Sequence, residues 1–316
     1  MPRTWAITGA TGLLGNNLAR ALVERGEHVR LLVRGASRKE LDGIDAERVE
    51  GDLADASALR RCFEGADVVV HSAAMVWIGY GRRAEMERVN VEGTRAACAA
   101  IAPGQRLVHV SSVDALGMRT RAQPADEDCA PQPHEEGVPY VDTKRAADRV
   151  VRESGVDHVI VHPTFMIGPW DWRPSSGKML IEVARGKALF APAGGNNFVH
   201  VADVVAGLIA AADGPRGRAW ILGNENLTYR EAWTTFARAT GGRAPIGEVP
   251  RWAGMAAAWA VTPLPEGEIN PASIRMGFLP HYFDPSRARR ELGMPATPVE
   301  QAARDAWAWF RERGYA

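Results

Sequence analysis

The sequence predicts an α/β fold with a doubly wound parallel sheet and a smaller, discontinuous C-terminal substrate domain. Three observations support this fold class. Short β-branched runs alternate with helical stretches, a glycine-rich turn joins the first strand to the first helix, and the composition changes after Pro163. With 316 residues, the chain is long enough for one large domain that carries a smaller one.

The strands and helices are predicted from the spacing of apolar residues. Short β-branched runs, of the kind found in buried parallel sheets, lie at residues 5–7, 29–33, 68–70, 107–110 and 159–161. Apolar stripes at helical spacing predict helices at residues 13–25, 56–64, 84–102 and 140–154. Because helices and strands alternate, we expect helices on both faces of the sheet.

The later part of the chain predicts a second domain. Gly, Pro and Trp are frequent at residues 167–177, and a Pro-rich tract spans residues 245–285. Between them, residues 198–205 return to strand-then-helix character, and Asp203 is expected to cap that helix. We therefore predict a sheet domain at residues 1–162, rejoined by about 196–223, and a substrate domain at residues 163–195 and 224–316.

Charge and cysteine content narrow the classes of partner. Lys plus Arg equals Asp plus Glu at 38 each, so no uniform field would recruit nucleic acid or an anionic membrane, and a small-molecule partner is expected. Cys62, Cys98 and Cys129 are far apart, without the spacing of a metal site or a disulfide framework. We expect reduced thiols, no metal and, without a signal peptide, a cytoplasmic location.

The most apolar later segment is residues 252–261. It contains Gly254 and is followed by Pro263, so it is far shorter than the roughly 20 residues of a membrane span. We interpret it as a packing helix. The alternative is that Trp252 and Trp259 contact a lipid-like ligand.

The glycine-rich turn predicts a dinucleotide site. Gly9, Gly12 and Gly15 have GxxGxxG spacing directly after the first strand and open a helix, where glycines let the backbone approach a pyrophosphate. We expect contacts from Gly9, Thr11, Gly12, Leu13 and Leu14.

The ends of the next strands predict the type of dinucleotide. Arg34 ends the second strand, where an NAD site typically presents an acid to the ribose, and an arginine suits a 2′-phosphate instead. NADP(H) is therefore favoured, with NAD(H) left open. Arg38 and Lys39 either add charge there or form a solvated turn. Gly51, Asp52 and Leu53 end a further predicted strand between the runs at residues 29–33 and 68–70. Asp52 and Leu53 are expected at the adenine edge, although Asp52 equally fits a helix cap.

Tyr140 and Lys144 form the candidate catalytic pair. They are four residues apart and so share one face of a helix. A phenol with a reference pKa of about 10 needs a nearby cation to exchange a proton at neutral pH, and the lysine supplies one. Ser112, at the end of the strand at 107–110, is placed to hold a substrate oxygen, and Ser111 or a merely structural serine is the alternative.

Three further positions near the strand ends have predicted roles. Asn90 lies in the middle of a predicted helix, where its low propensity suggests a buried hydrogen-bonding task. Ala73 and Ala74 are small enough for the backbone to pass close to a cofactor. We expect His71 to be a buried histidine whose ring nitrogens have partners.

Taken in order, these segments resemble the extended short-chain dehydrogenase/reductase superfamily over nearly the whole chain. The motifs at residues 89–94, 109–113, 162–169 and 198–204 look like the dihydroflavonol reductase branch, which includes members named hopanoid-associated sugar epimerases. The resemblance implies that Ser112, Tyr140 and Lys144 are a catalytic triad and that Asn90 supports the lysine. It also implies that the backbone after Pro163, including Phe165 and Met166, meets the nicotinamide.

One departure from the family pattern is His71-Ser72-Ala73-Ala74, where many members have Asn-Ala-Ala. The resemblance favours an NADP-preferring oxidoreductase that reduces a ketone or aldehyde, or oxidises the alcohol. A nucleotide-sugar epimerase or dehydratase that retains its cofactor and a non-catalytic dinucleotide sensor are the alternatives. Both a monomer and a homodimer remain open.

The expected substrate pocket is partly aromatic. Residues 75–80 form an apolar loop that, with Trp170 and Trp172, is expected to face the nicotinamide, which suggests an apolar or aromatic substrate. The alternative is that these aromatic residues only pack the domain junction. The pocket residues predicted are Trp77, Ser112, Tyr140, Met166 and Trp170.

Overall fold

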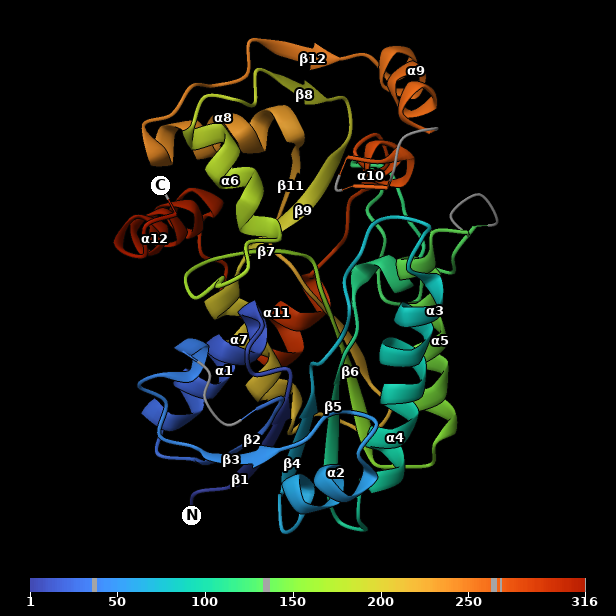
Figure 1. Ribbon diagram of the computed structural model, residues 1–316, viewed down its shortest axis with the longest axis vertical. Helices are drawn as coiled ribbons and strands as arrows, with labels where there is room; N and C mark the ends of the chain where they lie inside the picture. Colours follow the sequence, from blue (N-terminus) through green and yellow to red (C-terminus); the bar gives the residue numbers. More distant parts are fainter. Residues whose placement is uncertain (36–38, 133–136, 263–265, 268, 316) are drawn as a thin grey trace.

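The computed structural model describes residues 1–35, 39–132, 137–262, 266–267 and 269–315, and a seven-stranded sheet forms its centre (Figure 1). Every neighbouring pair of strands in this sheet is parallel, and the spatial order is β10-β6-β5-β4-β1-β2-β3. The strands are β1 (Thr4–Thr8), β2 (His28–Val33), β3 (Glu47–Glu50), β4 (Val68–His71), β5 (Arg106–Val110), β6 (His158–Pro163) and β10 (Ala219–Leu222).

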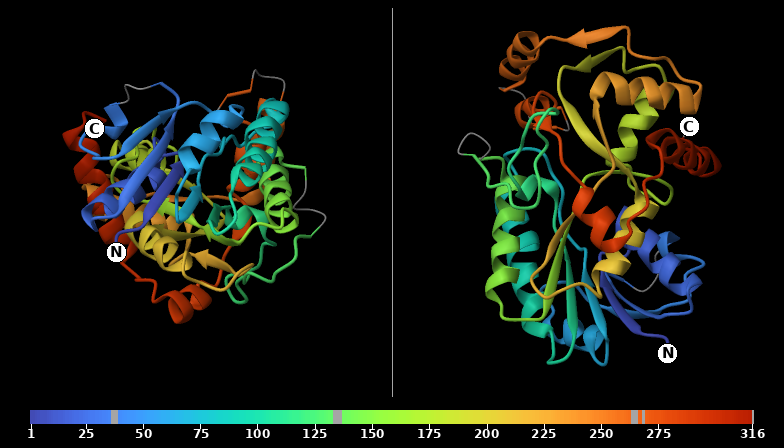
Figure 2. Two further views of the ribbon diagram at one scale, coloured as in Figure 1. Left: turned by 90° about the horizontal axis from the view of Figure 1, so that it is seen from below. Right: turned by 180° about the vertical axis from the view of Figure 1, so that it is seen from behind.

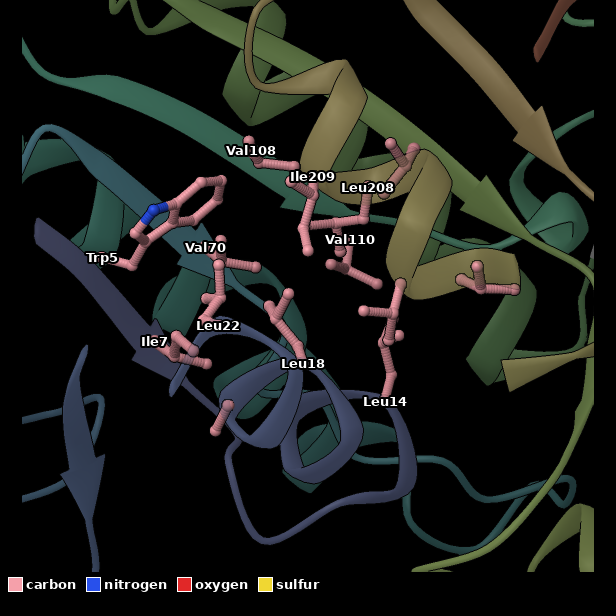
Figure 3. Packing of buried hydrophobic residues seen from close by; sticks show 14 of the residues in the cluster. Trp5, Ile7, Leu14, Leu18, Leu22, Val70, Val108, Val110, Leu208 and Ile209 are labelled. Atoms are coloured by element: carbon pink, nitrogen blue, oxygen red, sulfur yellow. The ribbon is translucent and has the colours of Figure 1, made fainter. Parts of the chain in front are cut away.

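Helices cover both faces of this sheet, as predicted. One face carries α1 (Leu13–Glu24), α7 (Val201–Ala211) and α11 (Ser286–Leu292), and the other carries α2 (Ala56–Phe63), α4 (Gly93–Ala100) and α5 (Pro139–Glu153). The alternation along β1 explains the two layers, because Trp5 and Ile7 pack with Leu18 of α1 whereas Ala6 packs toward α2. Figure 3 shows the first of these layers between the sheet, α1 and α7. The doubly wound α/β fold is confirmed.

The predicted helix at residues 84–102 is divided into three parts. A short helix α3 (Arg83–Met86) is followed by a π-helical segment, Glu87–Glu92, and then by α4. Asn90 lies inside the π-helical turn with its side chain buried, and π-turns of this kind are frequent at functional sites. The other predicted helices end within one residue of the observed bounds.

A second, smaller sheet stands at the carboxyl edge of the large one (Figure 2). It contains β7 (Phe165–Ile167), β9 (Gly195–His200), β11 (Glu225–Thr228) and β13 (Pro280–His281), while β8 (Phe190–Pro192) pairs with β12 (Gly247–Val249). Its helices are α6 (Ser176–Ala184), α8 (Tyr229–Thr240), α9 (Arg251–Val261), α10 (Pro271–Met276) and α12 (Val299–Glu312).

Sheet membership follows the predicted division only in part. The helix α7 and the strand β10 return to the large sheet, as expected, but β9 belongs to the small one and α11 packs on α7 and β10. The chain therefore crosses between the two layers more often than predicted, and the predicted domain boundaries remain an interpretation.

The helix α7 begins three residues earlier than the prediction required, so Asp203 does not cap it. His200 is the N-cap, and its Nδ1 accepts a hydrogen bond from the backbone nitrogen of Ala202 at 2.9 Å. Asp203 is buried in the first turn, where its carboxylate accepts from the backbone nitrogen and the hydroxyl of Thr297 at 2.7 and 2.8 Å.

The helix α9 forms where an apolar segment was predicted, but its tryptophans do not pack. Trp252 and Trp259 are 76% and 83% exposed, so the interpretation as core side chains is wrong. The positions that face inward are Gly254 and Ala258, one helical turn apart, and Gly254 lies so close to Phe278 that a Cβ there would be 2.1 Å from its ring. No helix in the described part of the chain is long and apolar enough to cross a membrane.

Candidate active site

A cleft of about 1450 Å³ lies where the carboxyl ends of the large sheet meet the smaller one. Ligands of doubly wound sheets bind at this edge. The volume exceeds the roughly 300–1,000 Å³ of a typical small-molecule pocket, so a long cofactor and a second molecule can lie in it together.

The glycine-rich turn forms one wall of the cleft. Gly9 has a φ of 80°, and a Cβ there would lie 2.7 Å from the backbone nitrogen of Ala73. A Cβ at Gly15 would lie 2.4 Å from the carbonyl oxygen of Gly9. The turn therefore requires glycine at both positions, which explains their spacing.

The first turn of α1 faces the cleft without a side-chain cap among the described residues. Gly12 is the N-cap, and Thr11, Gly12, Leu13 and Leu14 line the cleft. An uncapped helix N-terminus presents backbone N–H groups and a partial positive charge, which suits the pyrophosphate of a dinucleotide.

The predicted ribose and adenine contacts also lie on this wall. Arg34, Asp52 and Leu53 line the cleft together with the glycine turn. Asp52 accepts hydrogen bonds from the backbone nitrogens of Ala54 and Asp55 at 2.8 and 3.2 Å, whereas Asp55 is the residue that caps α2. Asp52 thus shapes the turn at the cleft edge rather than the start of the helix.

Ala73 and Ala74 line the cleft directly after β4. The backbone nitrogen of Ala73 donates to the Thr8 hydroxyl at 3.2 Å. The His71 ring is buried, with its nitrogens 2.9 Å from the Thr8 hydroxyl and 3.1 Å from the Thr94 hydroxyl. The prediction of a buried histidine with partners is confirmed.

Ser112, Tyr140 and Lys144 come together in the lining of the same cleft. Ser112 directly follows Ser111, the first residue after β5, and Tyr140 and Lys144 share the buried face of α5. Each side chain is buried, and the Lys144 Nζ donates to the carbonyl oxygen of Val110 at 3.0 Å. The three residues are therefore held in fixed positions at the end of β5.

Burial acts on both titratable members of this group. It raises the pKa of the Tyr140 phenol, the negative charge of Asp114 raises it further, and the hydrogen bond with Ser112 lowers it. Burial also lowers the pKa of Lys144 to about 8, although the carboxylates of Asp148 and Asp114 oppose that shift. Burial, Asp114 and Ser112 are the causes of the Tyr140 shift in this structure, so the predicted effect of the Lys144 charge on the phenol stays a prediction.

Asn90 connects two walls of the site. Its Oδ1 accepts from the backbone nitrogen of Met75 at 2.7 Å, and its Nδ2 donates to the Met75 carbonyl at 3.0 Å and to the Thr143 hydroxyl at 3.1 Å. Asn90 thus holds the segment after β4 against α5, and its contact on α5 is Thr143, which directly precedes Lys144. A role for Asn90 in supporting the lysine remains a prediction.

The substrate side of the cleft differs from the aromatic pocket that was predicted. Pro163, Phe165 and Met166 line the cleft, as predicted. Trp77 and Trp170, which the structure also describes, are not among the residues that line it. The Trp77 indole donates to Glu266 at 3.3 Å. Trp170 has a φ of 66°, and its ring lies against α1, where the Arg20 guanidinium is 3.4 Å from the ring centroid.

Trp170 and Trp172 instead pack with Trp309 of α12, with ring centroids between 5.2 and 6.3 Å apart. Trp170 and Trp172 therefore pack the domain junction, which was the alternative to their predicted place beside the nicotinamide. The polar lining that sequence reasoning missed includes Asp114, Asn196, Tyr229 and His281. Asp114 could have been found, because it stands two residues after Ser112, but the other three come from distant segments without a local signal.

The fold and this site agree with a known family. The chain belongs to the NAD dependent epimerase/dehydratase family, whose model matches residues 5–223, and so to the extended short-chain dehydrogenase/reductase superfamily. It is an enzyme of that type, since its relatives carry the names of reductases and dehydrogenases.

Three relatives match along almost the entire chain. Sterol demethylase protein B of Methylococcus capsulatus (strain ATCC 33009 / NCIMB 11132 / Bath) is 38% identical and covers 98% of this chain and 99% of its own length. A protein of Synechocystis sp. (strain ATCC 27184 / PCC 6803 / Kazusa) that bears a dihydroflavonol 4-reductase name is 35% identical, covering 98% and 95%. The 4-hydroxy-2-methyl-3-oxo-4-farnesyl-3,4-dihydroquinoline-1-oxide ketoreductase of Stigmatella aurantiaca is 31% identical, covering 95% and 94%.

Solved structures show the same architecture. A nucleoside-diphosphate-sugar epimerase of Pseudomonas aeruginosa has a TM-score of 0.83 and 26% identity over 99% of both chains. The Bordetella bronchiseptica enzyme WbmH in complex with NAD+ has a TM-score of 0.78 and 23% identity over 99% of this chain and 100% of its own, and this likeness concerns the fold.

Proposed function

We propose that this protein is an NADPH-preferring reductase of a ketone or aldehyde on a small, largely apolar molecule, and that it also oxidises the corresponding alcohol. The observation that carries the proposal is the position of Ser112, Tyr140 and Lys144, which line one cleft together with the glycine turn of α1. The proton donor Tyr140 and the glycine turn suited to a dinucleotide therefore line the same cleft.

The residues of the cleft fit a bound dinucleotide. The glycine turn, which a Cβ at Gly9 or Gly15 would obstruct, suits the pyrophosphate, and Arg34 suits a 2′-phosphate. Asp52 and Leu53 lie where the adenine edge would be held, and Pro163, Phe165 and Met166 lie where the nicotinamide would be held. When bound, the cofactor supplies the hydride or accepts it.

The chain's own residues handle the proton and the orientation of the substrate. Tyr140 donates its hydroxyl proton to the substrate oxygen during reduction, and its raised pKa makes the neutral phenol the resting form. Lys144 carries a positive charge below a pH of about 8 and holds the ribose side of the cofactor. Ser112, hydrogen-bonded to Tyr140, sets the direction of the phenol group.

Two observations support an apolar substrate with an oxygen function. Val76, Ile78 and Met276 line the cleft together with polar residues such as Asp114 and His281, so the lining combines apolar surface with polar groups. Two relatives bear the names of enzymes for a sterol and for a farnesylated ketone. These names favour hydrophobic molecules with a carbonyl or hydroxyl group.

The test is to follow nicotinamide absorbance of the purified protein with NADPH or NADH across aliphatic and aromatic ketones, steroid ketones and nucleotide sugars. Net oxidation of NADPH with a carbonyl compound supports the reductase. Conversion of a nucleotide sugar without net absorbance change establishes the epimerase instead. Cofactor binding without conversion of any compound establishes a non-catalytic sensor.

Tyr140→Phe is the sharpest single change for this proposal. The variant loses the proton donor but keeps the ring that packs beside the cofactor, so turnover should fall by about 10²–10⁴-fold while the Kd for NADPH stays nearly the same. Initial rates and a fluorescence titration of NADPH measure the two quantities. Retained turnover removes Tyr140 from the mechanism.

A further inference from the structure

We propose that Asp114, together with His281, is a proton-relay group of this site, which connects Tyr140 with solvent by way of the Ser112 hydroxyl. This inference rests on the proposed reductase function and deepens it. It starts from a contact that the mechanism above does not use, between the Ser112 side chain and the carboxylate two residues later.

The local backbone places Asp114 on Ser112. Ser112 is the N-cap of a single 3₁₀ turn, Val113–Ala115, and its Oγ accepts from the backbone nitrogen of Asp114 at 3.2 Å. The same Oγ donates its proton to the Asp114 Oδ2 at 2.9 Å. A short turn thus holds a carboxylate permanently against the hydroxyl of a triad residue.

This contact determines what Ser112 can do. A serine hydroxyl has one proton and two lone pairs, so when the proton is directed to Asp114 the oxygen offers only acceptor sites to the cleft. The hydrogen bond with Ser112 lowers the pKa of Tyr140, so it favours the phenolate and has Ser112 as its donor when Tyr140 is ionised. The hydroxyls form a chain from Tyr140 through Ser112 to Asp114.

His281 extends this chain from the other sheet. Its Nε2 lies 3.6 Å from the Asp114 Oδ1, which is within ion-pair distance. The Asp114 side chain is 18% exposed and lines the cleft with His281, so the relay reaches solvent through the cleft.

The other charged groups around the triad have different partners. Lys144 donates to the Val110 carbonyl, and Asp148, one turn behind it, lies 3.4 Å from His109 and 3.2 Å from His162 in the buried interior. Among the described acids that line the cleft, Asp114 is the one hydrogen-bonded to a triad residue. The relay therefore passes through Asp114.

The proton balance of a reduction is as follows. The carbonyl carbon gains a hydride from the bound cofactor, and the carbonyl oxygen takes the proton of the Tyr140 hydroxyl, which leaves a phenolate. The Ser112 hydroxyl turns from Asp114 to the phenolate and gives it its proton, and the Ser112 oxygen takes in return the proton of a protonated Asp114 carboxyl. Asp114 has received that proton from His281 or solvent, so one solvent proton is consumed in each turnover. Oxidation of an alcohol runs through the same groups in reverse.

The test compares Asp114→Asn with the parent enzyme. Asparagine keeps the shape but cannot pass a proton, so kcat should fall by about 10²-fold, KM for NADPH should stay unchanged, and the pH dependence of kcat should flatten. Asp114→Glu should restore part of kcat, and His281→Gln should reduce it less. Asp126→Asn, an exposed acid of the neighbouring loop, is the matched control and should leave kcat unchanged.

A second measurement does not depend on turnover. The Asp114 charge raises the pKa of Tyr140, so in Asp114→Asn the phenolate absorbance of Tyr140 should develop at lower pH, with Tyr140→Phe in each background to isolate its signal. An active parent enzyme whose Asp114→Asn variant keeps both kcat and the Tyr140 titration unchanged overturns the relay. A parent enzyme that reduces no carbonyl overturns the proposed function instead, and the relay with it.

Discussion

Tyr140 and Lys144 are nearly inaccessible to solvent, and burial moves their two pKa values in opposite directions because it disfavours the charged form of each. The phenol becomes harder to ionise and the ammonium easier to neutralise. At the scale of single residues, the protonation states of Tyr140 and Lys144 therefore depend on burial as much as on the residue types.

The first residue-scale prediction concerns pH. The pKa of Lys144 is lowered to about 8, so the protein has the ammonium below that pH and loses it as the pH rises through 8. The affinity for the anionic cofactor should fall over this interval, and Lys144→Met should bind weakly with no such step. Fluorescence titrations with NADPH between about pH 6 and pH 10 measure it. An affinity of the parent protein that is constant across the interval contradicts the assignment.

The second residue-scale prediction concerns the choice of cofactor. Arg34 lines the cleft at the end of β2, where it would pair with a 2′-phosphate. Arg34→Ala should reduce the preference for NADPH over NADH by about 10–100-fold, as expected for a hydrogen bond to a charged group. Arg25→Ala, an exposed arginine at the far end of α1, is the control. If the preference survives Arg34→Ala, the phosphate contact is wrong.

At the scale of elements, the sequence pattern identified α5 and α9 equally well, but it separated buried from exposed faces only for α5. The heavy, apolar side chains of α9 point outward, while its inward face consists of Gly254 and Ala258. Small residues permit close packing against Phe278, and this geometry leaves Trp252 and Trp259 in solvent.

The element-scale prediction compares two tryptophans. Trp259 is 83% exposed, whereas Trp220 of β10 is fully buried and donates its indole proton to Glu291 at 2.8 Å. Trp259→Ala should change the free energy of unfolding by less than about 0.5 kcal/mol, whereas Trp220→Ala should lower it by about 3–5 kcal/mol. Urea denaturation of both variants measures the difference. Equal losses would show that Trp259 packs in the folded protein.

At the scale of the whole molecule, contacts between the two sheets' layers connect segments that are far apart in the sequence. Asp203 in α7 accepts two hydrogen bonds from Thr297, just before α12. The cleft lies between these layers, so such contacts also hold its two walls in register.

The whole-molecule prediction removes one of these contacts. Asp203→Ala leaves the Thr297 nitrogen and hydroxyl without their acceptor, so the free energy of unfolding should fall by about 1–3 kcal/mol. Asp213→Ala, which breaks only the exposed ion pair with Arg3, should cost at most about 1 kcal/mol. Denaturant midpoints measure both. Similar small losses would mean that Asp203 does not join the layers.

The sequence by itself determined most elements of the large sheet and its helices, and the convergence of the candidate triad. Strand and helix periods are local properties of the chain, and the carboxyl ends of parallel strands meet at one edge, so Ser112, the glycine turn and the start of α5 were bound to face the same space. Tyr140 and Lys144 share a face because they are one helical turn apart.

Only the tertiary structure decided the rest of the site. Asn196, Tyr229 and His281 reach the cleft from three separate elements, and no local pattern states which distant segments will pack together. The ring of Trp170 turned to α12, and His200 rather than Asp203 capped α7, because neighbouring layers offered those side chains their partners. Local sequence sets the period and face of an element, whereas the direction of a junction side chain depends on the surface that packs against it.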